Sequence, residues 1–307
     1  MSLSRTLKAH ILLILVTLVW GATFVQIKDA LQDISPLLFN AVRMTLAAAV
    51  LAVIYLPHLR SMNSRVLRSG ALVGVFLWLG YEFQTTGLKF TTASKSAFLT
   101  SLSVVLVPIF LTVFWRRKVS LWTTVGVIAA FVGLYLLTVP SGAEQDWLGN
   151  FRSVNFGDAL TMGCAVAFAF QIILVGRATS AHSFQAIAVL QSAVAAALMF
   201  ASAPLLENIH VHWSERVIAA ILVTGLLGTA AAFTIQAWAQ QFMAPANTAL
   251  IFALEPVFAW ITSYLLLGER LGWRAAAGAL LILAGLIFSE VLGAAPAATQ
   301  TVQPSAG

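Results

Sequence analysis

A carboxylate stands in the middle of an apolar stretch near the end of the chain, where Glu255 and Pro256 interrupt Pro245 to Leu267. An ionisable side chain at bilayer depth is costly unless it faces protein, water or a partner. Glu255 could bind a cationic solute or a coupling proton, or it could cap freed backbone donors or pair with an arginine as part of the packing. Pro256 removes a backbone donor and loosens the preceding turn. Both interpretations of Glu255 are open at this point.

Two other ionisable residues lie inside apolar stretches. Arg43 has apolar neighbours within Pro36 to Leu56, which favours a structural role, such as pairing with a carboxylate inside the protein. Glu82 lies near one end of Val66 to Leu88. There it could contact a solute, or it could be neutralised by Lys89 or Lys95.

Uncharged polar and aromatic residues recur in several apolar stretches. Amides both donate and accept hydrogen bonds, and aromatic rings provide apolar walls, so the set suits a pocket for a neutral or zwitterionic solute. The alternative for any single member is hydrogen bonding between helices. The candidate lining residues, to which Glu82 and Glu255 are added, are Trp20, Gln26, Tyr81, Gln84, Ser96, Thr100, Ser103, Gln171, Gln236, Gln240 and Thr248.

Other chemistries find little support in the residues. His210 and His212 lie beside Glu207 and Glu215, but within one connection, which favours a solvated loop over a metal site. The single cysteine, Cys164, forms no metal-binding motif, and no GxxxxGK[ST] loop for ATP is present. We therefore expect no catalytic residues, no cofactor and no metal. Nucleic-acid binding is not expected, because the basic residues form short clusters between apolar stretches.

The elements that carry these residues are predicted to be membrane-spanning helices. Hydrophobic residues make up 60% of the 307 residues and charged residues only 9%, with a mean hydropathy of +0.92. Runs of about 20 apolar residues are long enough to cross a hydrocarbon core of about 30 Å. We predict an all-α polytopic membrane protein with ten helices at residues 10–27, 36–56, 66–88, 93–114, 121–139, 156–176, 184–205, 217–240, 245–267 and 273–292.

The charge pattern predicts an orientation. With the N-terminus inside, the inner connections of the first half hold most of its Lys and Arg, whereas only Arg177 lies inside in the second half. We follow the first half, because early helices usually dominate topology. The inner residues of that half are Arg5, Lys8, Arg60, Arg65, Arg68, Arg116, Arg117 and Lys118.

A weak internal repeat appears when the chain is shifted along itself so that Gln84 falls on Gln236. The same shift places Ser103 on Glu255, and it places a pair of glycines in the fifth helix, Gly126 and Gly133, on a pair in the tenth. Each pair puts two small residues on one helix face, as close packing requires. Because a repeat of five helices is odd-numbered, the second copy must enter the membrane from the opposite side.

The chain resembles the EamA-type transporters of the drug/metabolite transporter superfamily. The resemblance is carried by WGATF at residues 20–24, the lone Arg43, TTASKSAFLTSL at residues 91–102, and the Glu-Pro and Gly-Glu signature between residues 245 and 285. It implies two inverted five-helix repeats, cytoplasmic termini and a central cavity lined mainly by helices 1, 3, 4, 6, 8 and 9. One departure is that the first repeat has Val104 where the second has Pro256, with its own proline at Pro108. The two central helices are therefore not expected to be strictly symmetric.

We accordingly predict a secondary transporter in the plasma (inner) membrane, with both termini cytoplasmic. It would export small polar or amphipathic metabolites, such as amino-acid-like solutes, by alternating access, with Arg43, Glu255 and Pro256 in structural or coupling roles. The predicted partners are a small solute, the lipid bilayer and, as an open alternative, protons. An intramembrane enzyme acting on lipid or peptide and a non-transporting scaffold are the alternatives. The predicted segments are a first repeat at 1–139, a connection at 140–155, a second repeat at 156–293 and a disordered tail at 294–307.

Overall fold

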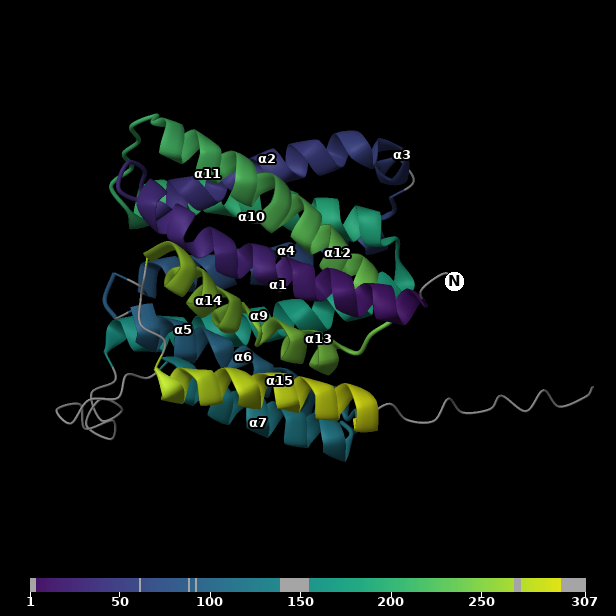
Figure 1. Ribbon diagram of the computed structural model, residues 1–307. Helices are drawn as coiled ribbons and strands as arrows, with labels where there is room; N and C mark the ends of the chain where they lie inside the picture. The colour runs from purple at the N-terminus through teal and green to yellow at the C-terminus, as the bar shows by residue number, and fades with distance from the viewer. Residues whose placement is uncertain are drawn as a thin grey trace, which may run out of the picture.

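The structure is a computed structural model that describes residues 4–60, 62–87, 89–91, 93–138, 155–267 and 272–293. Within these ranges the chain is helical apart from its connections and one isolated bridge between Ile34 and Val211 (Figure 1). The predicted tail at 294–307 and all of the predicted connection except Asn155 lie outside the described residues.

The helices of the first half follow the predicted stretches closely. Ser4 caps the first helix by accepting a hydrogen bond from the Leu7 N–H, and Pro36 occupies the start of the second, where its missing donor costs nothing. The helices are α1 Arg5–Ala30, α2 Pro36–Ile54, the short α3 Leu56–Leu59, α4 Ser64–Gly87, α5 Ala93–Ser101, α6 Ser103–Trp115 and α7 Leu121–Thr138.

The second half repeats this succession with more interruptions. Asn155 and Asp158 form a capping box at its first helix, and Pro245 begins α13. The helices are α9 Phe156–Ala181, α10 Phe184–Leu206, α11 Glu215–Gly225, the π-helical η1 Leu226–Ala231, α12 Ala232–Ala239, α13 Pro245–Phe252, α14 Glu255–Leu267 and α15 Trp273–Gly293.

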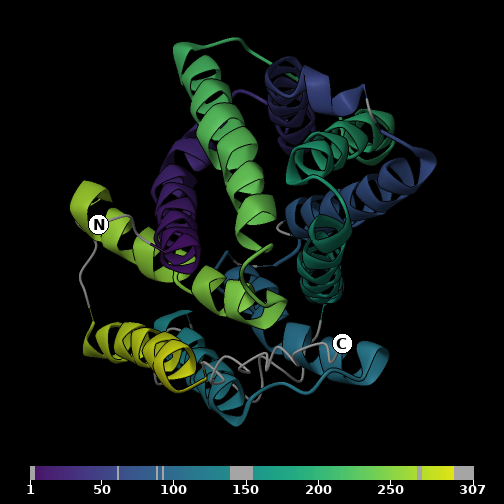
Figure 2. The same cartoon turned by 90° about the vertical axis from the view of Figure 1, so that its right-hand side faces the viewer.

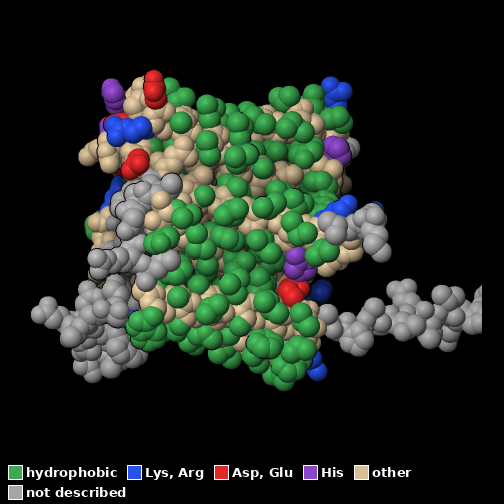
Figure 3. All heavy atoms as spheres, in the orientation of Figure 1, with side chains coloured by type: hydrophobic (Ala, Val, Ile, Leu, Met, Phe, Trp, Pro, Cys, Tyr) green, Lys and Arg blue, Asp and Glu red, His purple; other side chains and the backbone are tan. Residues whose placement is uncertain are grey.

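Nine helical stretches of the described chain are long and apolar enough to cross a membrane. The pair α13 and α14 occupies the remaining predicted crossing, where Glu255 interrupts the apolar run. Apolar side chains dominate the middle of the face shown in Figure 3, and charged side chains lie toward its two ends. Exposed residues such as Leu265, Leu280 and Val291 would be costly in water but suit a lipid environment.

The glycine pairs predicted to allow close packing do so against each other. An added Cβ on Gly126 would lie 2.5 Å from the Gly285 carbonyl oxygen, and one on Gly133 would lie 2.5 Å from that of Gly278. Both contacts join α7 to α15, which lie side by side at one edge of the molecule in Figures 1 and 2. The shift that superimposes the halves turns the first contact into the second, as a pseudo-two-fold relation requires.

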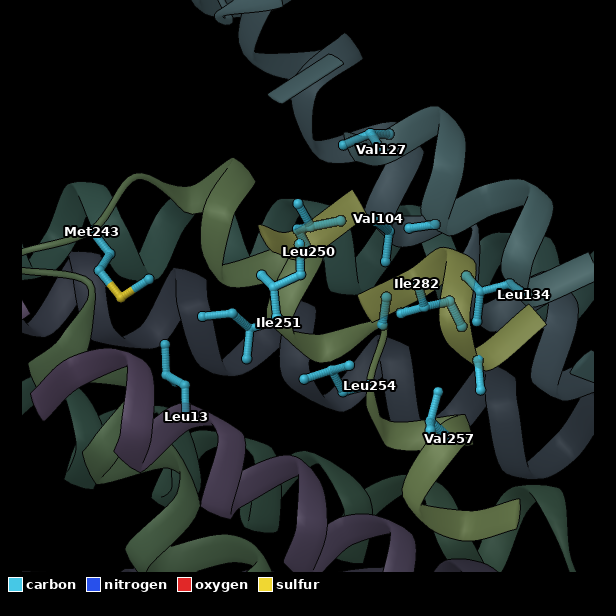
Figure 4. Packing of buried hydrophobic residues seen from close by; sticks show 14 of the residues in the cluster. Leu13, Val104, Val127, Leu134, Met243, Leu250, Ile251, Leu254, Val257 and Ile282 are labelled. Atoms are coloured by element: carbon cyan, nitrogen blue, oxygen red, sulfur yellow. The ribbon is translucent and has the colours of Figure 1, made fainter. Parts of the chain in front are cut away.

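The largest cluster of buried apolar residues joins α7 and α15 to the rest of the bundle. Figure 4 shows Val104 of α6, Leu250 and Ile251 of α13, and Ile282 of α15 among its members, with Leu13 of α1 nearby. Ile282, Leu250 and Ile251 have no exposed surface. This packing fixes the interrupted crossing α13–α14 against α1, α6 and α15.

Candidate functional site

Two crossings are broken at equivalent positions. The helix that begins at Ala93 is interrupted at Leu102, and the one that begins at Pro245 is interrupted at Ala253 and Leu254. Ser103 and Glu255 are therefore the first residues of α6 and α14. They are the two residues that the internal shift superimposes, although Val104 replaces proline in the first half. The breaks coincide in position, while the prolines of the two central helices differ in place: Pro108 lies inside α6 and Pro256 is the second residue of α14.

The backbone at the second break bonds with tighter turns than an α-helix. The Ala253 N–H is shared between the Ala249 and Leu250 carbonyls at 3.2 Å each, and the Leu254 N–H donates to the Ile251 carbonyl at 3.0 Å. Such 3₁₀-type bonds satisfy donors that the interruption would leave free. The break therefore persists without needing the Glu255 side chain to cap these two donors.

Glu255 is half-buried at the contact between α14 and α1. An added Cβ on Gly21 would lie 2.9 Å from the Glu255 carbonyl oxygen and 2.6 Å from the Ala259 nitrogen, so only glycine lets α1 approach this closely. The Glu255 carboxylate lies within electrostatic range of the Tyr81 hydroxyl and the Cys164 thiol. Among the described residues no salt bridge joins it to a basic side chain. The carboxylate thus lies deep in the bundle, keeps accessible surface and lacks a partner cation there.

Arg43 binds aromatic rings where a carboxylate partner was expected. Its guanidinium carbon lies 4.6 Å from the centre of the Tyr81 ring and 5.7 Å from that of Phe39. The side chain is buried, and its Nε has no hydrogen-bond partner in the described chain. Cation–π attraction is stronger when the cation is desolvated, which suits this position. Tyr81 therefore contacts Arg43 and also lies within electrostatic range of Glu255.

A polar contact joins α4, α5 and α9 in the same region. Gln84 Nε2 donates to Thr100 Oγ1 at 3.5 Å, and Thr100 Oγ1 lies 3.7 Å from Cys164 Sγ. Cys164 was not among the predicted lining residues, because a lone cysteine in an apolar stretch carries no signal of function. Its contact with Thr100 and its position within electrostatic range of Glu255 place it at this site only through the tertiary fold.

Three buried glutamines form a separate network between helices. Gln171 Nε2 donates to Gln191 Oε1 at 3.0 Å and to Gln236 Oε1 at 3.3 Å, and Gln236 Nε2 donates back to Gln171 Oε1 at 3.1 Å. The network ties α9 to α10 and α12 and supports the structural alternative for Gln171 and Gln236. Gln191 was missed, although its amide stands within an apolar stretch as theirs do.

Of the other residues predicted to line a cavity, some keep accessible surface and others are buried or bonded within the protein. Trp20 donates from Nε1 to the Gly228 carbonyl at 2.7 Å, inside η1, and meets Phe252 edge-on at 5.0 Å between ring centres. The Thr248 hydroxyl is bonded to its own helix, at 3.3 Å from the Ala244 carbonyl. Ser96 is buried, while Gln26 and Ser103 keep accessible surface.

Glu82 is buried, and neither of its carboxylate oxygens has a hydrogen-bond partner in the described chain. Lys89, one of its two expected partners, lies instead 3.8 Å from Glu207 Oε2. Glu207 Oε1 also accepts from the Leu38 N–H at 2.9 Å and so caps the start of α2. The side chain of Lys95, the other expected partner, lies outside the described part.

The connection that holds His210 and His212 docks against the α1–α2 connection. The His212 N–H donates to the Asp33 carbonyl at 2.7 Å, and the Ser35 N–H donates to the His210 carbonyl at 2.9 Å. Asp33 also accepts from Ser214 Oγ at 2.6 Å. The described residues contain no group of three or more His, Cys, Asp or Glu side chains arranged to hold a metal.

Comparison with known proteins agrees with this architecture. The chain is 34% identical over 290 residues to an uncharacterized transporter of Archaeoglobus fulgidus, covering 92% of this chain and 86% of that protein. It is 27% identical to the uncharacterized transporter YoaV of Bacillus subtilis, covering 90% and 94%. A solved crystal structure matches the fold with a TM-score of 0.74 at 17% identity, over 93% of this chain and 97% of that one.

A family model described as the EamA-like transporter family matches residues 7–139 and residues 155–290. The two matched segments together span most of the chain and begin at the same helix of each half. The chain therefore belongs to the EamA-like transporter family.

Proposed function

We propose that the protein is a secondary transporter that moves small polar or amphipathic solutes by alternating access. The observation that carries this proposal is the pair of equivalent helix breaks, which place Ser103 and Glu255 at the start of half-helices α6 and α14. Interrupted helices near the midplane are a common way for transporters to expose backbone and side-chain groups to a solute.

The solute site is assigned to the space around Glu255, Tyr81 and Trp20. Glu255 supplies a negative charge that is free of a cation among the described residues, and it binds either a cationic group of the solute or a coupling proton. Tyr81, held by Arg43, and Trp20, held by its bond to η1, provide rigid aromatic walls.

We assign the other lining residues to three roles: solute contact, packing, and the path on either side of the centre. Gln84, Thr100 and Ser103 face the same region through the α4–α5–α9 contact and the first break, and we assign them to solute contact. Gln171, Gln236 and Thr248 act mainly through packing, because their polar atoms already bond within the protein. Gln26, Ser96, Glu82 and Gln240 contribute along the path on either side of the centre.

Movement is proposed to divide the chain into the predicted units 1–139 and 156–293, joined by 140–155. We take the close contact of α1 with α14 at Gly21 as the surface across which the halves rock, since the two backbones approach each other directly there. Both termini are assigned to the cytoplasm, with the protein in the plasma membrane, following the basic residues of the first half. Export is proposed as the direction.

Flux measurements in liposomes test the proposal. The purified protein should carry members of a panel of amino acids, nucleosides and quaternary amines at rates above those of empty liposomes. Flux equal to that of empty liposomes across the panel would refute transport, and product formation from lipid or peptide without flux would favour an intramembrane enzyme.

The role of Glu255 is tested by Glu255→Gln, with Glu215→Gln at the exposed start of α11 as the matched control. If Glu255 carries a proton, the first variant loses accumulation driven by a pH gradient but keeps downhill exchange, and the control keeps both. If Glu255 binds the cationic group of the solute, both accumulation and exchange fall together. Intact accumulation in Glu255→Gln excludes both roles.

A further inference from the structure

A cavity of about 470 Å³ opens at the end of the bundle that holds the start of α1 and the ends of α6 and α9. It lies between the α6–α7 connection, the last turns of α9 and the α12–α13 connection. Its volume falls within the range of small-molecule pockets, about 300–1,000 Å³. The cavity is built from both halves of the chain and lies apart from the Glu255 region, at the far end of α13.

The charges on the cavity wall are all positive. Arg117, Lys118 and Arg177 line it, and no acidic residue does. No carboxylate of the described chain forms a salt bridge with any of the three. Arg177 is held in place by Trp115, whose ring centre lies 5.4 Å from the guanidinium carbon. Cations gathered in a concave, partly apolar wall concentrate their field on whatever anion enters.

The carboxylate behind the wall is already engaged. Asn247 lines the cavity and donates from Nδ2 to Glu290 Oε1 at 2.8 Å, while the other Glu290 oxygen lies 2.6 Å from His10 Nε2. Glu290 is therefore turned toward His10 and Asn247, and it is not a partner for the three cations.

Besides the three cations, a buried amide lines the cavity, and its oxygen is unpaired among the described residues. Gln240 lines the cavity and is only 4% exposed, and its Nε2 donates to the Ile172 carbonyl at 3.0 Å. Its Oε1 is buried without a hydrogen-bond partner in the described chain. A buried acceptor left unpaired is costly, so a ligand that offers a hydroxyl or ammonium donor would satisfy it.

We propose that this cavity binds a small organic anion that carries a phosphate or carboxylate together with a hydroxyl or ammonium donor. The anionic group contacts Arg117, Lys118 and Arg177, which can hold it through charge-assisted hydrogen bonds, and the donor bonds to Gln240 Oε1. A soluble phosphorylated polyol and the head group of an anionic lipid share this chemistry. The site exists whether or not its occupant is the transported solute.

Binding to the full-length protein in nanodiscs distinguishes the two sources. In discs of phosphatidylcholine, sn-glycerol 3-phosphate is titrated with glycerol as the uncharged comparison, and protein stability is read from the reaction of Cys164 with a thiol dye. A second set of discs contains phosphatidylglycerol. Saturable stabilisation by glycerol phosphate but not glycerol assigns a soluble ligand, and stabilisation by phosphatidylglycerol alone assigns a head group. Absence of both effects refutes the site.

Substitutions locate the binding. Arg177→Gln should weaken binding about tenfold, because it removes one of the three cations assigned to the anionic group, and Arg177→Lys should restore part of it. Arg65→Gln is the matched control, because Arg65 is an exposed residue at the start of α4 and does not line the cavity. An equal loss in both Gln variants would show that only the general surface charge matters, which overturns the proposal.

Gln240→Leu tests the donor requirement. We expect it to weaken binding of glycerol phosphate severalfold while leaving inorganic phosphate unaffected, because only the former carries hydroxyls separate from its phosphate that can reach Oε1 while the phosphate stays on the cations. Equal effects on the two probes would contradict the assigned role. Each variant must first show wild-type stability without ligand, so that loss of folding is not read as loss of binding. Solute flux does not enter these readouts, so this site and transport fail or succeed separately.

Discussion

Replacing Gly133 with alanine should force α7 away from α15. The added Cβ would lie 2.5 Å from the Gly278 carbonyl oxygen, and the backbone nitrogen of Ile282 would lie 3.0 Å away, so rigid atoms resist it. Ordinary contact begins near 3.4 Å, and the helices must therefore separate by up to about 0.9 Å. Overpacking of this kind costs typically about 1–3 kcal/mol, and the better helix propensity of alanine returns about 0.5–1 kcal/mol. We expect a net loss of roughly 1–2 kcal/mol in the free energy of unfolding.

Gly228→Ala is the matched control within the same bundle. Its added Cβ would meet only Thr224 and Trp20 atoms at 3.8 Å, which is ordinary van der Waals contact. The control should be neutral or slightly stabilising, since alanine restricts the unfolded chain without strain in the folded one.

Thermal unfolding can be followed through the single cysteine of the chain. Cys164 is buried, so its labelling by a thiol-reactive dye reports opening of the structure around it, and the rise in labelling on heating marks unfolding. The midpoint of labelling should fall for Gly133→Ala and stay or rise for Gly228→Ala.

The reciprocal geometry of the contact gives a sharper test. A Cβ on Gly278 would clash with the Gly133 carbonyl at the same 2.5 Å, so either substitution alone already separates the helices. The double variant should therefore lose less stability than the two single losses added together. Additive losses, or equal midpoints for Gly133→Ala and Gly228→Ala, would refute the assignment of close packing to these glycines.

Three further predictions follow from particular contacts. The hydrogen bond from Ser214 holds the pKa of Asp33 below its ordinary 3.8. The contact therefore stabilises the fold above pH 3.8, and this stabilisation is lost as the pH falls through the lowered pKa. Asp33→Asn should flatten this acid dependence in thermal unfolding. Trp20→Phe leaves the Gly228 carbonyl of η1 without its side-chain donor and should cost about 1–2 kcal/mol in chemical unfolding. Gln191→Leu removes one hydrogen bond but also a buried unpartnered Nε2, so the free energy of unfolding should change by less than about 1 kcal/mol. Solute flux should persist in this variant. Lost flux at unchanged stability would place the glutamine network in the solute site.

The correspondence between sequence and structure is closest where local chemistry decides the outcome. Apolar length fixes each crossing, and caps or prolines at Ser4, Pro36 and Pro245 fix where helices begin, so the predicted ranges agree with the structure within a few residues. The glycine pairs also follow from sequence, because small residues seven apart share one helix face and signal close packing.

The sequence predicted an irregularity in only one of the two broken helices, and the structure was needed to locate both breaks. Pro256 indicates an irregularity in the second half. The first half breaks at the equivalent place without a proline there, and its Pro108 lies inside the continuous α6. A break held by packing and 3₁₀-type bonds requires no particular residue type, so the break in the first half could not be located from the position of a proline.

The partners of the polar residues were decided by the tertiary structure alone. Sequence determined that Glu255, Arg43 and the glutamines lie inside the membrane-spanning stretches, because hydropathy and residue type are local properties. It could not determine that Arg43 stacks on Tyr81, that Gln191 completes a glutamine network, or that Cys164 reaches the Glu255 region. Those contacts depend on how helices far apart in the chain rotate and pack against one another, and many rotations satisfy the same apolar pattern when lipid surrounds the bundle.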